Sequence, residues 1–257
     1  MIDTNVDLFR WPYRRLIGDE PTMLRARLRA RGVAQAWASS YEALFCHDMA
    51  GVNLRLADAC NDTGNRFFVP FGCVNLKLPD WKDDLHRCHE VHRMPGIRLF
   101  PNYHGYELSD PALGELLAGA AERKLIVQIA LSLEDTRTQA TIVPPVDPSP
   151  LADLLPQFPG VPIMLLNRGG WSYDANPKIG KIIRSENAYF DIAMNEGVGG
   201  LERFISATSS SRVVFGSHSP FFYFESALLK VREAGLPHDW ESAILQQNAD
   251  RLLNGRV

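Results

Sequence analysis

Eight short apolar segments recur along the chain, and sequence compatible with a helix follows each of them. Most are rich in Val, Ile, Leu and Phe, as parallel strands buried on both faces are. Regular alternation of strand and helix, with no change in composition, predicts an α/β fold in which a parallel sheet closes into a (β/α)8 (TIM) barrel. We expect the strands at Ile2–Leu8, Val33–Ala38, Arg66–Val74, Gly96–Pro101, Leu125–Leu131, Val161–Leu166, Tyr189–Ala193 and Arg212–Gly216.

One domain is expected to span residues 1–257, because 257 residues suit a single barrel and the sequence shows no linker or repeat. The alternative is a doubly wound open sheet. That fold usually carries a glycine-rich phosphate-binding turn after its first strand, and this sequence has none there.

Charge and cysteine content narrow the classes of function. A net charge of -3 gives no electrostatic reason to expect nucleic acid or an anionic membrane as a partner. No apolar run reaches the roughly 18 residues of a membrane span. The four cysteines are far apart, with no Cys-x-x-Cys pair, and the first residues carry no secretion signal. We therefore expect a cytoplasmic protein, either monomeric or homo-oligomeric, that acts on a small molecule.

The first predicted strand carries polar side chains at alternate positions, namely Asp3, Asn5 and Asp7. Two interpretations stay open. The strand lies at a solvated sheet edge, or its polar groups point into a functional site.

Polar residues also stand at the ends of other predicted strands, and in a barrel these ends share one rim where active sites lie. Asp7 and His218 are the predicted catalytic pair, in which a carboxylate and an imidazole activate water or move a proton. Arg98 is predicted to anchor an acidic substrate, while Asn5 and Asn167 donate hydrogen bonds to an oxyanion. The other predicted substrate-binding residues are His104 and Arg168, and Asp191 lies in the same set.

The same pattern has a plainer explanation, in which these polar groups only satisfy one another in the core.

Three further segments of the chain bear on its function. Residues 132–148 form a long proline-rich loop, either a functional lid or a surface insertion. The aromatic run 221–224 either walls the pocket, meets another subunit or packs in the core. His86, His89 and His92 are assigned to an outer helix face, because their spacing does not match the zincin motif.

Four segments resemble one family. The opening Ile2–Asp7 is similar to the Asp-x-His-x-His start of the amidohydrolase superfamily, in its amidohydrolase-2 branch. Gly96–Pro101 resembles that branch's Gly-(Val/Ile)-Lys-Leu-His-Pro segment, and Phe215–Pro220 resembles its Phe-Gly-Ser-Asp-x-Pro segment. Gln247–Leu253 is similar to its closing Asn-Ala-x-Arg-Leu-Leu helix. The resemblance spans the whole chain and implies a TIM-barrel enzyme.

The chain departs from this pattern at the positions of the family's metal ligands. Asn5 and Asp7 stand where the resemblance implies two histidines, Ala130 and Asn167 where it implies two more, and His218 where it implies an aspartate. One carboxylate, one imidazole and two amides are a poor set for Zn²⁺. We therefore predict no metal cofactor. If a single divalent ion such as zinc is bound, Asp7, His218, Asn5 and Asn167 are its predicted ligands.

The resemblance implies a hydrolase of the amidohydrolase-2 type that cleaves a C–O or C–N acyl bond in a small carboxylated or aromatic molecule. Two alternatives stay open. One is a lyase of the aromatic-acid decarboxylase type, and the other is a barrel that binds a small molecule without catalysis.

Overall fold

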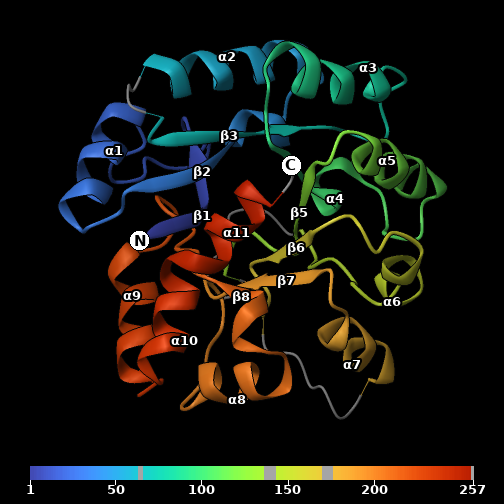
Figure 1. Ribbon diagram of the computed structural model, residues 1–257. Coiled ribbons are helices and arrows are strands. Elements are labelled where there is room, and N and C mark those ends of the chain that lie inside the picture. Colours follow the sequence, from blue (N-terminus) through green and yellow to red (C-terminus); the bar gives the residue numbers. More distant parts are fainter. Residues whose placement is uncertain (63–65, 136–142, 170–175, 256–257) are drawn as a thin grey trace.

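A computed structural model of the protein describes residues 1–62, 66–135, 143–169 and 176–255. Its centre is one sheet of eight parallel strands in the order β1 to β8 (Figure 1). This arrangement, ringed by helices, confirms the predicted TIM barrel. The strands are β1 (Ile2–Leu8), β2 (Gln35–Ser40), β3 (Phe68–Cys73), β4 (Gly96–Leu99), β5 (Ile126–Ala130), β6 (Ile163–Leu166), β7 (Ala188–Asp191) and β8 (Val213–Val214).

Backbone hydrogen bonds between β1 and the segment that follows β8 close the barrel. Thr4 N donates to the Phe215 carbonyl over 2.9 Å, and His218 N donates to the Asn5 carbonyl over 2.9 Å. Every residue of β1 is buried. The interpretation of β1 as a solvated edge strand is therefore wrong, because both of its edges are paired and its polar side chains lie inside the protein.

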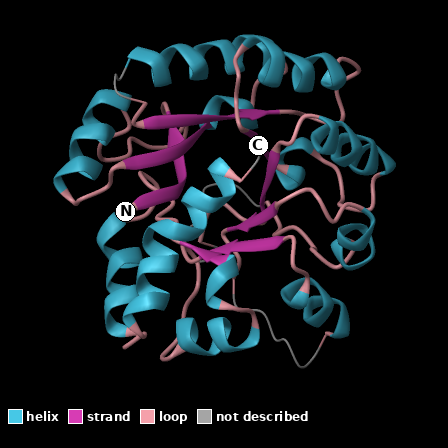
Figure 2. Ribbon diagram, viewed as in Figure 1, coloured by secondary structure: helices cyan, strands magenta, loops and turns pink. Residues whose placement is uncertain are grey.

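Helices surround the strands on the outside (Figure 2). The longer ones are α1 (Pro21–Ala30), α2 (Met49–Asp62), α5 (Pro111–Glu122), α7 (Pro177–Arg184), α8 (Gly200–Ala207) and α9 (Phe224–Glu233). The short ones are α3 (Trp81–His86), α4 (Pro101–His104), α6 (Leu151–Leu154), α10 (His238–Ser242) and α11 (Asn248–Asn254). Over the described part of the chain, no helix is long and apolar enough to cross a membrane.

Two predicted elements differ in detail. The helix expected at 79–94 consists of α3 followed by a π-helical turn at Arg87–Val91. The eighth strand is only Val213–Val214, because the chain after it turns inward to pair with β1.

The two ends of the barrel interior differ in polarity. At the amino ends of the strands, Trp37 and Phe71 stack with ring centroids 4.9 Å apart. Leu252 of α11 packs in the same apolar cluster, and α11 crosses the centre of the strand ring (Figure 1). The carboxyl ends of the strands carry the polar side chains. The fold therefore seals one end with apolar packing and gathers the polar groups at the other.

Candidate active site

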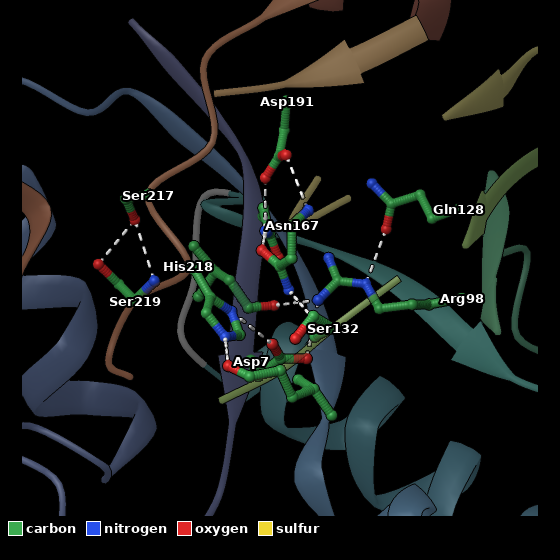
Figure 3. Close-up of polar contacts among 12 residues, drawn as sticks. Asp7, Arg98, Gln128, Ser132, Asn167, Asp191, Ser217, His218 and Ser219 are labelled. Atoms are coloured by element: carbon green, nitrogen blue, oxygen red, sulfur yellow. Dashed lines mark hydrogen bonds and ion pairs between the residues drawn. The ribbon is translucent and has the colours of Figure 1, made fainter. Parts of the chain in front are cut away.

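A buried ion pair links β1 to β4. Nη1 of Arg98 donates to Oδ1 of Asp7 over 2.8 Å, and both side chains are 1% exposed. Gln128, the β5 residue in register with Arg98, accepts from its Nε over 2.9 Å. The guanidinium is thus held by two neighbours, and it fixes the direction in which the Asp7 carboxylate points (Figure 3).

His218 follows β8 and is 0% exposed. Its Nε2 lies 2.8 Å from the Leu133 carbonyl oxygen, which can only accept a hydrogen bond. Burial lowers the pKa of His218 below its ordinary value, with the charge of Asp7 opposing that effect. The imidazole is therefore neutral near pH 7, with its proton on Nε2 and a free lone pair on Nδ1.

That lone pair faces Asp7. Nδ1 of His218 lies 3.7 Å from Oδ2 of Asp7, too far for a direct hydrogen bond (Figure 3). The structure thus brings the two predicted catalytic residues together, with two acceptor atoms facing each other.

Amide groups connect the remaining strand ends. Nδ2 of Asn5 donates to Oδ1 of Asn167 and to Oδ2 of Asp191, each over 2.7 Å. Asn167 donates in turn from its side chain to the Ser132 carbonyl over 2.7 Å and from its backbone to Oδ1 of Asp191 over 2.9 Å. These contacts also fix the amide orientation of Asn5, because the reverse orientation would place its oxygen against two acceptors.

A second acidic residue of β1 is fully buried beside the site. Asp3 accepts hydrogen bonds from the Ser217 backbone over 2.9 Å and from the Ser217 hydroxyl. Burial raises its pKa to about 7, while these hydrogen bonds act in the opposite direction. Burial likewise raises the pKa of Asp191 to about 6. Both carboxyl groups thus change protonation state nearer to neutral pH than ordinary aspartates do.

Several buried polar atoms around the Asp7–His218 pair have no hydrogen-bond partner within the described ranges. They are Oδ2 of Asp7, Nδ1 of His218, Nη2 of Arg98, Oδ1 of Asn5 and the Tyr41 hydroxyl. Tyr41 directly follows β2, whose Ser39 pairs with Asp7, so it lies at the same end of the barrel as the ion pair. Burial raises the pKa of Tyr41 well above its ordinary value. Buried polar groups are nearly always paired, so such a group of exceptions is typical of a ligand or water site.

Aromatic side chains cover this end of the barrel. Trp11 makes an edge-to-face contact with Phe221, with ring centroids 5.2 Å apart, and with Tyr41 at 5.5 Å. Phe221 stacks on the His218 ring at 5.3 Å. Phe221 and Phe222 of the aromatic run thus pack over the site, and Phe224 packs in the outer core, while Tyr223 is exposed.

Two other predicted substrate-binding residues are buried next to this network, and the charge of Arg168 acts on Asp191. His104 bonds through Nε2 to the Ala43 carbonyl over 2.8 Å. The Arg168 guanidinium lies over the Phe204 ring of α8, 3.6 Å from its centroid. Of the predicted loop at 132–148, for which a lid and a surface insertion stayed open, the residues at 136–142 lie outside the described part. Its first residues are fixed, because the Ser132 and Leu133 carbonyls accept from Asn167 and His218.

Sequence reasoning missed Gln128, Tyr41 and the two loop carbonyls. Gln128 gave a usable signal, since it is a lone polar residue within the apolar strand β5. Tyr41 and the carbonyls gave none, because their roles depend on how distant segments meet in space.

The family model described as Amidohydrolase, of the amidohydrolase-2 branch, matches residues 13–255. The chain belongs to the amidohydrolase-2 family. No curated protein matches the chain.

Solved structures agree in fold with this amidohydrolase-2 protein. A 2,6-dihydroxybenzoate decarboxylase from Rhizobium is 15% identical, covers 99% of this chain and 100% of its own, and gives a TM-score of 0.71. A dihydroxybenzoic acid decarboxylase from Polaromonas, with bound manganese and 2-nitroresorcinol, is 15% identical over 89% of this chain and 84% of its own, at a TM-score of 0.71. A 5-carboxyvanillate decarboxylase from Novosphingobium aromaticivorans, also with manganese, is 17% identical. The match covers 89% of this chain and 79% of the decarboxylase, with a TM-score of 0.65.

The donor set of this chain does not fit the family's histidine-rich metal centre. Oδ1 of Asn167 already accepts from Asn5, and Oδ1 of Asp7 accepts from the cationic Arg98. Both Asp191 oxygens likewise accept, from the Asn5 side chain and the Asn167 backbone. One carboxylate oxygen, one imidazole nitrogen and one amide oxygen remain without a partner among the described residues, with a guanidinium beside them. Across the described residues, no group of three or more His, Cys, Asp or Glu side chains is placed to hold a metal. A manganese or zinc site needs more anionic or imidazole ligands than this.

Proposed function

We propose that the protein is a metal-independent hydrolase that cleaves a C–O or C–N acyl bond in a small carboxylated or aromatic molecule. One observation carries this proposal. Nδ1 of His218 and Oδ2 of Asp7 are two acceptors, 3.7 Å apart and without partners among the described residues. A water molecule has two O–H donors, and one bound between these atoms can satisfy both.

His218 acts as the general base in this scheme. Its neutral ring takes a proton from the water on Nδ1 while the water oxygen attacks the acyl carbon. The hydrogen bond from Nε2 to the Leu133 carbonyl keeps the ring in the required tautomer. Asp7 lies beside the imidazolium as it forms and stabilises its charge.

Two donors are positioned for the oxyanion that this attack creates. Nη2 of Arg98 and the Tyr41 hydroxyl are buried near the ion pair without partners in the described part of the chain. Preorganised donors in a site without bulk water stabilise such charge strongly. When the tetrahedral species collapses, the C–O or C–N bond breaks and the imidazolium returns its proton to the leaving group.

The direct experiment measures turnover in water enriched in oxygen-18. The probes are phenyl benzoate, benzanilide and their ring-carboxylated derivatives, together with 2,6-dihydroxybenzoate. Hydrolysis predicts oxygen-18 in the newly formed acid and no carbon dioxide. Carbon dioxide release without oxygen-18 in the product would contradict it.

A second candidate is a lyase that removes carbon dioxide from an aromatic acid. The decarboxylases among the solved structures favour it, and so does the burial of the site, since decarboxylation needs no water. It requires a proton donor at the ring carbon, whereas the two unpartnered atoms that face each other, Nδ1 of His218 and Oδ2 of Asp7, are both acceptors. We therefore place hydrolysis first. If the probes bind but yield neither product, a barrel that only binds its ligand is the remaining alternative.

A further inference from the structure

A cavity of about 750 Å³ lies beside the candidate site, outside the aromatic side chains that cover it. Its walls come from the segment after β1, from α1, from the loop after β7 and from α9. Ser219 and Phe221, which follow His218 in sequence, line its inner side. The cavity is thus large enough for a small organic molecule and lies next to the proposed base.

Cationic side chains dominate this cavity. Five line it, and two of these are already paired, Arg15 with Asp19 and Arg31 with Glu225. The Arg27 guanidinium donates to the Ile17 carbonyl. The cavity is also lined by Asp135 and Glu196, and both of these carboxylates interact with neighbouring groups.

Arg14 and Lys230 keep hydrogen-bond donors available to a ligand. The described contacts of Arg14 are with the Phe221 ring, whose centroid lies 5.0 Å from its Cζ. Nζ of Lys230 donates to the Ile192 and Ala193 carbonyls, which uses two of its three hydrogens, and the charges of Asp191 and Glu196 also act on it. Both cations thus meet the cavity with donor capacity left.

A buried donor lines the same wall. The Asn195 side chain is 8% exposed, and its Nδ2 has no hydrogen-bond partner within the described ranges. A buried amide nitrogen of this kind is costly unless a ligand or water accepts from it. Asn195, Lys230 and Arg14 all present donors, so the complementary ligand is an acceptor with negative charge.

Phe221 connects the cavity to the candidate site. Its ring lies under Arg14 and also stacks on His218, with centroids 5.3 Å apart. The Phe221 and Phe222 side chains, which both line the cavity and pack on the His218 ring, therefore lie between a molecule in the cavity and His218.

We propose that this cavity binds the carboxylate of an anionic substrate through Arg14, Lys230 and Asn195, and that the Phe221 ring moves aside when the acyl end of the substrate reaches His218. The assignment rests on the proposed function for its role in turnover, but binding can be tested without turnover. It also specifies the substrate class, a small molecule with an acid group at one end and the scissile acyl bond at the other.

The test measures binding of benzoate, neutral benzamide and inorganic phosphate by calorimetry. We expect saturable benzoate binding, at least about tenfold weaker in Arg14→Gln and in Lys230→Met, because each removes a charged donor. Arg29→Gln is the matched control. Arg29 lies on α1, and its Cζ lies 5.2 Å from the centroid of the Phe67 ring outside this cavity, so its replacement should leave benzoate binding unchanged.

Two comparisons separate this assignment from the proposed function. His218→Gln, which should abolish hydrolysis, should leave the benzoate Kd within about twofold. Thermal unfolding confirms that each variant is folded. Equal binding of benzamide, tighter binding of phosphate than of benzoate, or unchanged benzoate binding in both Arg14→Gln and Lys230→Met overturns the assignment.

Discussion

His218 carries its proton on the nitrogen that faces the Leu133 carbonyl, so only Nδ1 can accept a proton from a substrate or water. His218→Gln should lower kcat/KM by about 10²-fold or more, because general-base catalysis contributes roughly this amount. His238→Gln is the control, since that side chain is 91% exposed and on α10. Steady-state kinetics on the hydrolysed probe measure both. A normal rate in His218→Gln would remove the base from the scheme.

The pH profile follows from the same group. Burial lowers the pKa of His218 below its ordinary 6.5, so the ring remains an unprotonated base at pH values where a free histidine is protonated. We expect kcat/KM to be constant from pH 7.5 down past 6.5 and to fall only at lower pH. A midpoint of the kcat/KM profile above pH 6.5 would show that the charge of Asp7, which raises the pKa of His218, outweighs burial, which lowers it.

In the proposed mechanism, the Tyr41 hydroxyl contributes to catalysis at the expense of stability. Its buried hydroxyl has no hydrogen-bond partner in the described part of the chain, and an unsatisfied group of this kind costs about 1–3 kcal/mol. Tyr41→Phe should therefore unfold at a higher denaturant concentration than the native chain, while its kcat falls. Lower stability together with full activity would contradict the role given to the hydroxyl.

Asp3 predicts how stability changes with pH. Its pKa is raised from 3.8 to about 7, so the folded chain keeps a proton between these values that the unfolded chain releases. This contribution to the free energy of unfolding therefore declines as pH rises from about 4 to 7 and is constant above that. Asp3→Asn mimics the protonated carboxyl group, because its amide oxygen can accept from the Ser217 backbone while its NH2 group donates to the Ser217 hydroxyl oxygen, and it should remove the decline.

Denaturant unfolding of the native chain and Asp3→Asn between pH 4 and 8 measures the difference. The free energy of unfolding of Asp3→Asn should increase relative to that of the native chain as pH rises to 7. Asp239→Asn is the control, because that side chain is fully exposed. Its replacement should change the free energy of unfolding by the same amount at both ends of the pH range. A constant difference between Asp3→Asn and the native chain would show that Asp3 is not protonated in the fold.

Among the elements, α11 holds the short strand β8 in place. The buried side chain of Asn248 donates to the Ser210 and Val213 carbonyls, each over 2.7 Å. Asn248→Ala should lower the free energy of unfolding by about 2–4 kcal/mol, because two carbonyls lose their partner. Asn254→Ala, at the exposed end of the same helix, should change it by less than about 0.5 kcal/mol. Equal effects of the two variants would contradict this.

The strands could be predicted from the sequence because burial on both faces gives them continuous apolar runs. The limits of β8 could not, since Phe215 and the residues after it pair with β1 through their backbone and leave no side-chain signal. The resemblance of Gln247–Leu253 to the family's closing helix is explained by Asn248, which no periodicity argument identifies.

At the scale of the whole molecule, the closed barrel brings together residues that are far apart in sequence. Asp7 and Arg98 meet across 91 positions. The strand exits of a barrel share one rim, so this convergence was predictable. The direction of each side chain was not predictable, because the positions of His104 and Arg168 depend on contacts with Ala43 and Phe204.

We propose that this amidohydrolase-2 barrel hydrolyses its substrate without a metal ion. The most direct measurement is kcat/KM of protein dialysed against a chelator, with its metal content determined by mass spectrometry on the same sample. We predict unchanged activity at well under one metal ion per chain. Loss of activity on dialysis, restored by one equivalent of manganese or zinc, would contradict hydrolysis without a metal ion.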